Sequence, residues 1–193
     1  SATAISFLRN FSKEKIFNTI CTSATLVNPG PFQHAIEGGL IRNIWAGIGA
    51  SNGLRAADLT NVGITGTSKS LYNVFVESFG AKFNAQNMIP ELEFQWAVMQ
   101  SYHKQFACCQ YSHSAVEAVL QILPKFNYKE IEKIRLKTHW RGKLLSNLTP
   151  ATTLAAKFSM EHILATSIYH GSANVEAFNS KTLNNSKIKD LRE

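Results

Sequence analysis

Apolar residues in the first half of the chain recur mostly at helical spacing. Residues 12–27 predict a helix, because Ser12 suits an N-cap and apolar side chains follow every three or four positions: Ile16, Phe17, Ile20, Ala24 and Val27. A second long helix is predicted over residues 33–60, with a possible kink near Gly38. A third is predicted to end near residue 79. Helices therefore dominate the first half.

The second half mixes helical and alternating patterns. Residues 113–123 predict an amphipathic helix, and residues 152–170 predict another that ends at Gly171. Between them, apolar and basic residues alternate over 134–138, which is typical of a half-exposed strand. We therefore expect a fold that is mostly α with an α+β part.

Small residues form one stripe on the long helix predicted over residues 33–60. Gly49, Gly53 and Ala57 are spaced by four and so share a helix face. Glycine costs about 1 kcal/mol per helical position relative to alanine, so close packing of another helix must compensate. A bare backbone wall beside a ligand is the alternative, and the two interpretations are compatible.

The composition is that of a globular protein. The 193 residues are 45% hydrophobic and 17% charged, and no apolar stretch is long enough to cross a bilayer. The three cysteines (Cys21, Cys108 and Cys109) do not form a disulfide framework, because two are adjacent. We therefore expect a reduced, cytoplasmic compartment and no membrane partner.

A formal net charge of +7 predicts an attraction for anions. Many of the basic residues crowd into one run: Lys125, Lys129, Lys133, Arg135, Lys137, Arg141 and Lys143. The run contains no recognised nucleic-acid motif, so a solvated face is the simpler interpretation. Small polycarboxylates are also compatible with the charge.

Residues 102–113 concentrate chemically active side chains in the segment YHKQFACCQYSH. Adjacent cysteines do not fit the spacing of zinc ligands, and His103 and His113 are too far apart for one ligand pair. A redox site would need a Cys-x-x-Cys pair or an isolated thiolate beside a base. We therefore expect no metal centre here, and a redox centre is a minor alternative in which His113 lies near Cys109.

General acid–base chemistry is a further interpretation of the same segment. A partly desolvated Lys104 could exchange protons or hold a carboxylate, and His113 at a helix start would tend to stay neutral. Alternatively, Lys104 is a solvated surface lysine and His113 an ordinary first helical residue. The physics of the segment by itself favours this simpler alternative.

The order of several segments resembles a known family. The stretch AIEGGLIRNIWAGIGASNGLRAADLTNVGITG precedes FVESFG and YHKQFACCQYSHSAVEAVL, and then come EIEKIRLKT and PATTLAAKFSMEHILATSIYHGSANVEAF. This succession resembles the MmgE/PrpD family, which includes 2-methylcitrate dehydratase, cis-aconitate decarboxylase and iminodisuccinate epimerase. The resemblance covers nearly all of the chain.

The resemblance implies a domain organisation. Residues 1–85 would be part of an all-helical domain, and residues 86–193 would be an α+β lid domain, incomplete at its C-terminus. An upstream portion with the family's catalytic aspartate and histidine would be missing, so the chain would be an internal fragment that is inactive by itself. The resemblance also implies a homodimer, a small polycarboxylate as substrate, and no nucleic acid.

The resemblance also assigns site residues. The family's lid lysine falls on Lys104, with Cys109 and His113 matching its surroundings. A second basic position, usually lysine, falls on Arg42, and Trp45 stands where many relatives have histidine. Lys104 and His113 would be catalytic, and Arg42, Trp45 and Cys109 would bind substrate, without a cofactor or metal.

The implied chemistry is proton abstraction next to a carboxylate, followed by dehydration, decarboxylation or epimerisation, most closely like 2-methylcitrate dehydratase, a carbon–oxygen lyase. Arginine at position 42 can clamp a carboxylate but cannot carry a proton. A non-catalytic, anion-binding relative therefore remains the alternative, with a basic nucleic-acid-binding module as a third.

Overall fold

The computed structural model describes residues 1–84, 86 and 97–193. The chain divides into two compact units: Ser1–Gly30 with Asn43–Ser101, and Pro31–Arg42 with Tyr102–Glu193. The domain boundary expected between residues 85 and 86 falls beside residues that the structure does not describe, so this boundary stays a prediction. Within the described ranges, no helix has both the length and the apolar character that a membrane crossing requires.

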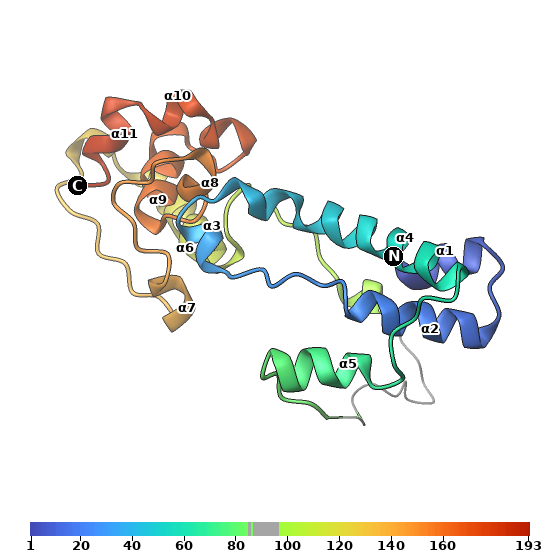
Figure 1. Cartoon of the computed structure of the whole chain (residues 1–193). Coiled ribbons are helices and arrows are strands. Elements are labelled where there is room, and N and C mark those ends of the chain that lie inside the picture. The colour runs from blue at the N-terminus through green and yellow to red at the C-terminus, as the bar shows by residue number, and fades with distance from the viewer. Residues whose placement is uncertain (85, 87–96) are drawn as a thin grey trace. The chain divides into compact units, whose positions relative to one another are not determined.

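Helices make up the regular structure of the first unit. Ser12 caps α2 as predicted, because its hydroxyl accepts a hydrogen bond from the Lys15 amide at 3.2 Å. Helix α2 packs against α4, and α1 packs against both (Figure 1). The helical elements of this unit are α1 (Ala2–Leu8), α2 (Lys13–Ala24), α4 (Trp45–Asn61), α5 (Ser70–Tyr72), a π-helical segment (Asn73–Ser78) and a 3-10 turn (Ala97–Gln100).

Part of the small-residue stripe is a helix contact. A Cβ added at Gly53 would collide with the side chain of Ser1 and come within 2.7 Å of the Ala2 amide nitrogen, so glycine lets α1 approach α4. Ala57 is fully buried. At Gly49 an added Cβ would meet nothing within 4 Å, although its carbonyl accepts a hydrogen bond from the Ser1 hydroxyl at 3.1 Å. Close packing therefore explains Gly53 and Ala57 but not Gly49.

The second unit is assembled around α9 (Met160–His170), which packs against α6 and α11. Eight residues of α9 are buried: Met160, His162, Ile163, Leu164, Ala165, Thr166, Ser167 and Ile168. The other α-helices are α3 (Gln33–Ile36), α6 (His113–Ile122), α7 (Trp140–Lys143), α8 (Thr153–Ala156), α10 (Ser180–Leu183) and α11 (Ser186–Asp190). Short 3-10 turns of this unit cover Gln110–Ser112, Leu123–Lys125, Tyr128–Glu130 and Val175–Phe178, and the turn Leu40–Ile44 begins in this unit and ends in the first.

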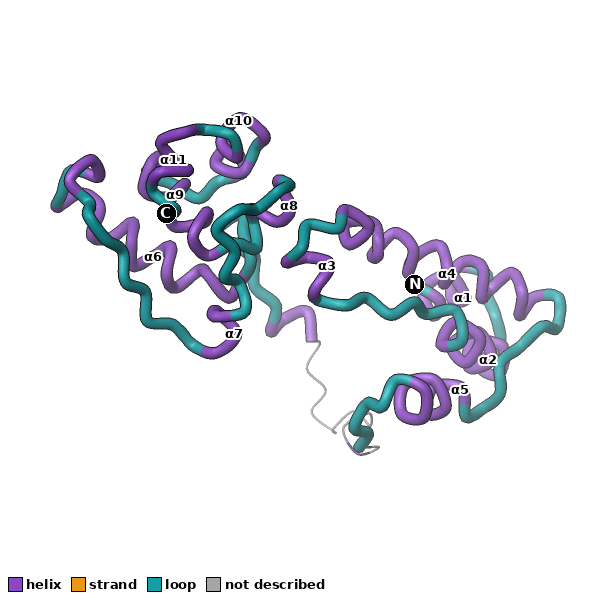
Figure 2. The backbone as a smooth tube through the Cα atoms, turned by 60° about the vertical axis from the view of Figure 1, so that its left-hand side comes forward, coloured by secondary structure: helices purple, strands orange, loops and turns teal. Residues whose placement is uncertain are grey.

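The predicted α+β part is wrong for the residues that the structure describes, since they contain no strand (Figure 2). Residues 131–139, which include the strand predicted at 134–138, have no regular secondary structure. Within the described ranges, no amide from 132 to 138 donates to a backbone carbonyl. Ile134 and Leu136 are also 39% and 37% exposed, so the alternating pattern buries no face. Residues 134–138 have the alternating sequence of a strand, but no other described segment forms β-sheet hydrogen bonds with them.

Two long predicted helices are interrupted. Gly38 adopts a positive φ of 80°, so the helix expected over 33–60 is divided into α3, a 3-10 turn and α4. The helix expected over 152–170 stops after α8 and restarts at Met160, because Ser159 caps α9 by accepting from the His162 amide at 3.0 Å. The predicted end at Gly171 is confirmed, with a φ of 65°.

Candidate functional site

The segment from Lys104 to His113 lies in the second unit and leads directly into α6. Its backbone is held at two points. The Ala107 amide donates to the Ala173 carbonyl at 2.9 Å, and the Cys109 amide donates to the Lys157 carbonyl at 2.9 Å. The segment is therefore tied to the loops on both sides of α9, which fixes where its side chains point.

Cys108 and Cys109 are both buried and unbridged. The Ser112 hydroxyl lies 3.3 Å from the Cys108 sulfur and donates to the Cys109 carbonyl at 2.7 Å. Burial raises the pKa of both thiols, and the hydrogen bonds and nearby cations only partly oppose this. Both thiols therefore stay protonated near neutral pH, and their role here is to form part of the wall of the site.

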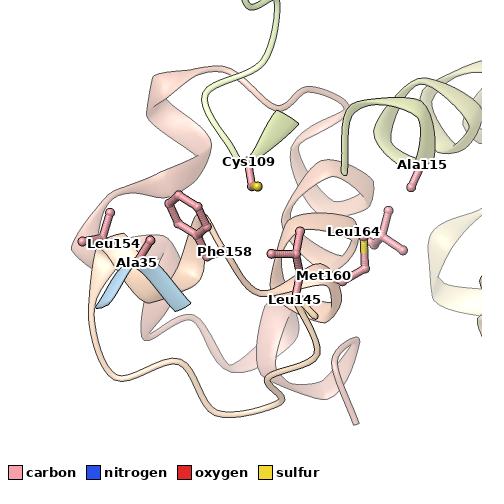
Figure 3. Packing of buried hydrophobic residues seen from close by; sticks show 8 residues of the cluster. All are labelled: Ala35, Cys109, Ala115, Leu145, Leu154, Phe158, Met160 and Leu164. Atoms are coloured by element: carbon pink, nitrogen blue, oxygen red, sulfur yellow. The ribbon is translucent and has the colours of Figure 1, made fainter. Parts of the chain in front are cut away.

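Cys109 also belongs to a cluster of buried apolar side chains (Figure 3). It comes from the loop before α6, whereas Phe158 comes from the connection between α8 and α9. The other members are Ala35, Ala115, Leu145, Leu154, Met160 and Leu164. Tyr111 packs against this cluster. We call these eight buried residues the apolar floor of the candidate site.

Basic side chains influence the pKa values of the two cysteines at this site. Burial is the main influence on the pKa of Cys109, but both Lys104 and Arg42 lower that pKa by their charge. Lys104 and Lys157 likewise lower the pKa of Cys108. Arg42 and Lys104 are far apart in the sequence, yet both act on one thiol. Both of these predicted site residues belong to the second unit, and the charge of each reaches the Cys109 thiol.

The guanidinium of Arg42 lies over the ring of Phe158. Its guanidinium carbon lies 5.7 Å from the centroid of Phe158, whose ring meets Phe32 edge-on with 5.9 Å between centroids. Within the described part of the chain, the one salt bridge is Arg9 with Asp58, so neither Arg42 nor Lys104 pairs with a carboxylate there. Both side chains are exposed and available to an anion from solution.

His113 is the first residue of α6 and is partly buried. Burial is the main cause that lowers its pKa, and the charge of Lys104 lowers it further, while the backbone of Cys108 and Phe106 opposes the shift. Its Nε2 atom is buried without a hydrogen-bond partner, and its ring lies edge-on to Phe106 at 5.1 Å. His113 is therefore neutral near pH 7, with burial rather than the helix N-terminus as the first cause.

Trp45 lies in the first unit, where it begins α4. Its ring packs so closely on Gly30 that an added Cβ there would come within 3.0 Å of it. With Gly49, Gly53 and Asn52, it lines a pocket of about 390 Å³. Its assignment as a substrate-binding residue stays a prediction.

Sequence reasoning missed two cations near the predicted site. Lys157 was placed inside one long helix, but it lies in the break between α8 and α9, beside Cys108. Arg141 was grouped with a solvated basic run. Its guanidinium carbon lies 5.6 Å from the ring centroid of Tyr111 and 5.0 Å from that of Trp140. No local pattern in the sequence marked either cation as part of the site.

A search of the described residues finds no group of three or more histidine, cysteine or acidic side chains that could hold a metal ion. The candidate site instead combines two cations, Arg42 and Lys104, with the buried apolar cluster and the neutral His113. Such an arrangement can bind and orient an anion, and it can stabilise negative charge that develops on one.

Comparison with known families gives one match. Residues 106–193 match the family model of the MmgE/PrpD C-terminal domain. No curated protein matches the chain. The match includes Phe106, Cys109 and His113, whereas Lys104 lies just ahead of it and Arg42 well before it.

Proposed function

Because residues 106–193 belong to the MmgE/PrpD family as its C-terminal domain, we propose that the chain supplies the carboxylate-binding part of a lyase or isomerase site. The substrate is a small di- or tricarboxylic acid. The reaction removes a proton from the carbon next to a carboxylate, and dehydration, decarboxylation or epimerisation follows. The match to the family model supports the proposal, and the reaction is part of what we propose.

One observation carries the proposal. Arg42 and Lys104 act on the same buried thiol, and neither is paired with a carboxylate among the described residues. Two unpaired cations held together repel each other, and an anion between them relieves that repulsion. A carboxylic acid with two or more ionised groups has the matching charge.

Each residue then has a role. Lys104 and Arg42 bind carboxylates, and their charge stabilises the enolate-like oxygen that forms when the neighbouring carbon loses its proton. Neutral His113 supports Lys104 or the substrate. Cys109 and Phe158 exclude water beneath the ligand. Proton abstraction of this kind needs no redox cofactor, and we assign none.

A second candidate is a relative that binds the anion without turning it over. Arg42 supports this candidate, because arginine stays protonated and cannot relay a proton as the lysine common at this position could. It can still hold a carboxylate through two parallel hydrogen bonds. In this second candidate the same residues bind the carboxylates, but no proton is removed from the bound acid.

Deuterium exchange separates the two candidates. The intact natural protein is incubated in D₂O with citrate, 2-methylcitrate, cis-aconitate and iminodisuccinate, and NMR follows the protons next to the carboxylates. A lyase or isomerase exchanges at least one acid in the wild type and loses that exchange in Lys104→Ala. Binding without exchange identifies the non-catalytic candidate. Absence of binding to every acid refutes both.

A further inference from the structure

Arg141 is held between two aromatic rings at the edge of the candidate site. Its guanidinium carbon lies 5.6 Å from the ring centroid of Tyr111 and 5.0 Å from that of Trp140. Rings attract the guanidinium through its flat faces and leave its N–H groups, which lie in the plane, free to donate. Within the described residues, no carboxylate forms a salt bridge with it.

Tyr111 connects Arg141 to the other cations. The backbone of Tyr111 lowers the pKa of the Cys109 thiol, and the charges of Lys104 and Arg42 lower the pKa of the same thiol. On its other side, the Tyr111 ring meets Phe32 at 5.9 Å. Phe32 in turn meets Phe158, the ring on which Arg42 stacks. A series of ring contacts therefore links Arg42 to Arg141 by way of Phe158, Phe32 and Tyr111.

The short helix α7 that carries Arg141 is itself anchored. His139 caps it, since Nδ1 of His139 accepts a hydrogen bond from the Gly142 amide at 3.3 Å. The His139 ring also meets the ring of Tyr111 edge-on, with 5.9 Å between centroids. Gly142 is close to Thr138, whose Cγ2 would lie 2.9 Å from an added Cβ. These contacts fix the position of α7 and so restrain Arg141. A side chain that is already restrained loses less conformational entropy when it binds a ligand.

We propose that Arg141 binds a second carboxylate of the anion that Lys104 and Arg42 hold, and so selects polycarboxylates over monocarboxylic acids. The inference rests on the proposed function and goes beyond it, because it assigns selectivity to a residue outside the motif that carries the resemblance. A monocarboxylate engages Lys104 and Arg42 only. A tricarboxylate additionally meets the in-plane N–H groups of Arg141, which match a carboxylate in two parallel hydrogen bonds.

Isothermal titration at constant ionic strength tests this selectivity. Citrate, succinate and propionate are titrated into the wild-type chain and into Arg141→Gln. We expect the substitution to weaken citrate binding about tenfold and to change propionate binding by less than about twofold, because only citrate has a further carboxylate for the N–H groups of Arg141. Arg141→Lys retains charge without the planar fork and should give an intermediate loss.

Arg135→Gln is the matched control, since Arg135 is an exposed residue of the same basic run and has no ring contact among the described residues. It removes the same charge and should leave the citrate-to-propionate ratio unchanged. An equal change of that ratio in both variants would show that only the overall charge matters, and would overturn the inference. Unchanged citrate binding in Arg141→Gln would overturn it as well.

Lys104→Ala distinguishes this inference from the proposed function. Loss of all binding in Lys104→Ala, with an unchanged ratio in Arg141→Gln, would leave the site standing and remove Arg141 from it. Citrate binding that depends on Arg141 and not on Lys104 would refute the shared site and, with it, both proposals. Thermal unfolding of each variant shows whether the chain is still folded, and a selective loss for one ligand cannot come from unfolding.

Discussion

The guanidinium of Arg42 stacks on the ring of Phe158, with 5.7 Å between the guanidinium carbon and the ring centroid. Phe158 is buried in the same apolar cluster as Cys109. An exposed cation from one part of the chain is thus oriented by the core under the candidate site. This relationship makes the position of Arg42 depend on a residue that cannot itself bind an anion.

Phe158→Leu tests that dependence. Loss of the ring removes a cation–π contact of about 0.5–1 kcal/mol, so citrate affinity should fall about threefold in isothermal titration. The smaller side chain should also lower the free energy of unfolding by about 1–2 kcal/mol. Phe178→Leu is the control, because Phe178 is equally buried but no arginine lies over its ring in the described residues. It should lose similar stability and keep its affinity.

Gly38 should tolerate no side chain. Its φ is 80°, and an added Cβ would collide with the hydroxyl of Thr152 and come within 2.9 Å of the Ala155 Cβ. That hydroxyl caps α8, accepting from the Ala155 amide at 3.0 Å. We expect Gly38→Ala to lower the free energy of unfolding by about 2–4 kcal/mol, measured by chemical denaturation.

Gly171→Ala is the comparison for that measurement. Gly171 also has a positive φ, 65°, but an added Cβ there meets nothing within 4 Å. Its cost should be about 1 kcal/mol, from backbone strain by itself. Equal losses at the two positions would show that the contact with Thr152 does not matter.

His162 should make the protein less stable in mild acid. It is fully buried, its Nδ1 atom lies 3.4 Å from a guanidinium nitrogen of Arg192, and its Nε2 atom has no partner. Burial, and then the charge of Arg192, lower the pKa of His162 from 6.5 to about 4. The unfolded chain therefore binds this proton more readily between those two values.

The free energy of unfolding should consequently fall as the pH drops from about 6.5 to about 4, by up to about 3 kcal/mol from this residue, and then level off. Denaturation of the wild type and of His162→Leu at several pH values checks this, because the variant should lose that part of the slope. Substitution of His170, an exposed histidine on the same helix, should leave the slope intact. A wild-type slope retained in His162→Leu would assign the effect elsewhere.

Local signals predicted α2, its Ser12 cap and the Gly171 terminus, because each depends on a few neighbouring residues. The strand at 134–138 was wrong because alternation describes only one side of a ladder, and pairing is a long-range property. The breaks at Gly38 and Ser159 were missed or understated because the apolar spacing continues on both sides of each. The resemblance used the order of several segments rather than any one, and residues 106–193 match the family model of the MmgE/PrpD C-terminal domain.

The candidate site was predictable only in part. Lys104, Cys109 and His113 are close in sequence, and the resemblance added Arg42. Lys157 and Arg141 could not be found from local pattern, since each joins the site through a loop connection or ring contact between distant segments. Isolated basic residues in a charged chain give no signal until the fold shows which of them lack a carboxylate partner.

The most direct measurement of the central claim is the affinity for citrate of the wild type, Arg42→Ala, Lys104→Ala and the double variant, at one ionic strength. Lys125→Ala, from the exposed basic run, is the control. A shared site predicts that each single substitution weakens binding about tenfold, that the double variant loses more than either, and that Lys125→Ala binds like the wild type. Citrate binding that is equal in all five proteins, or absent from the wild type, would contradict the account.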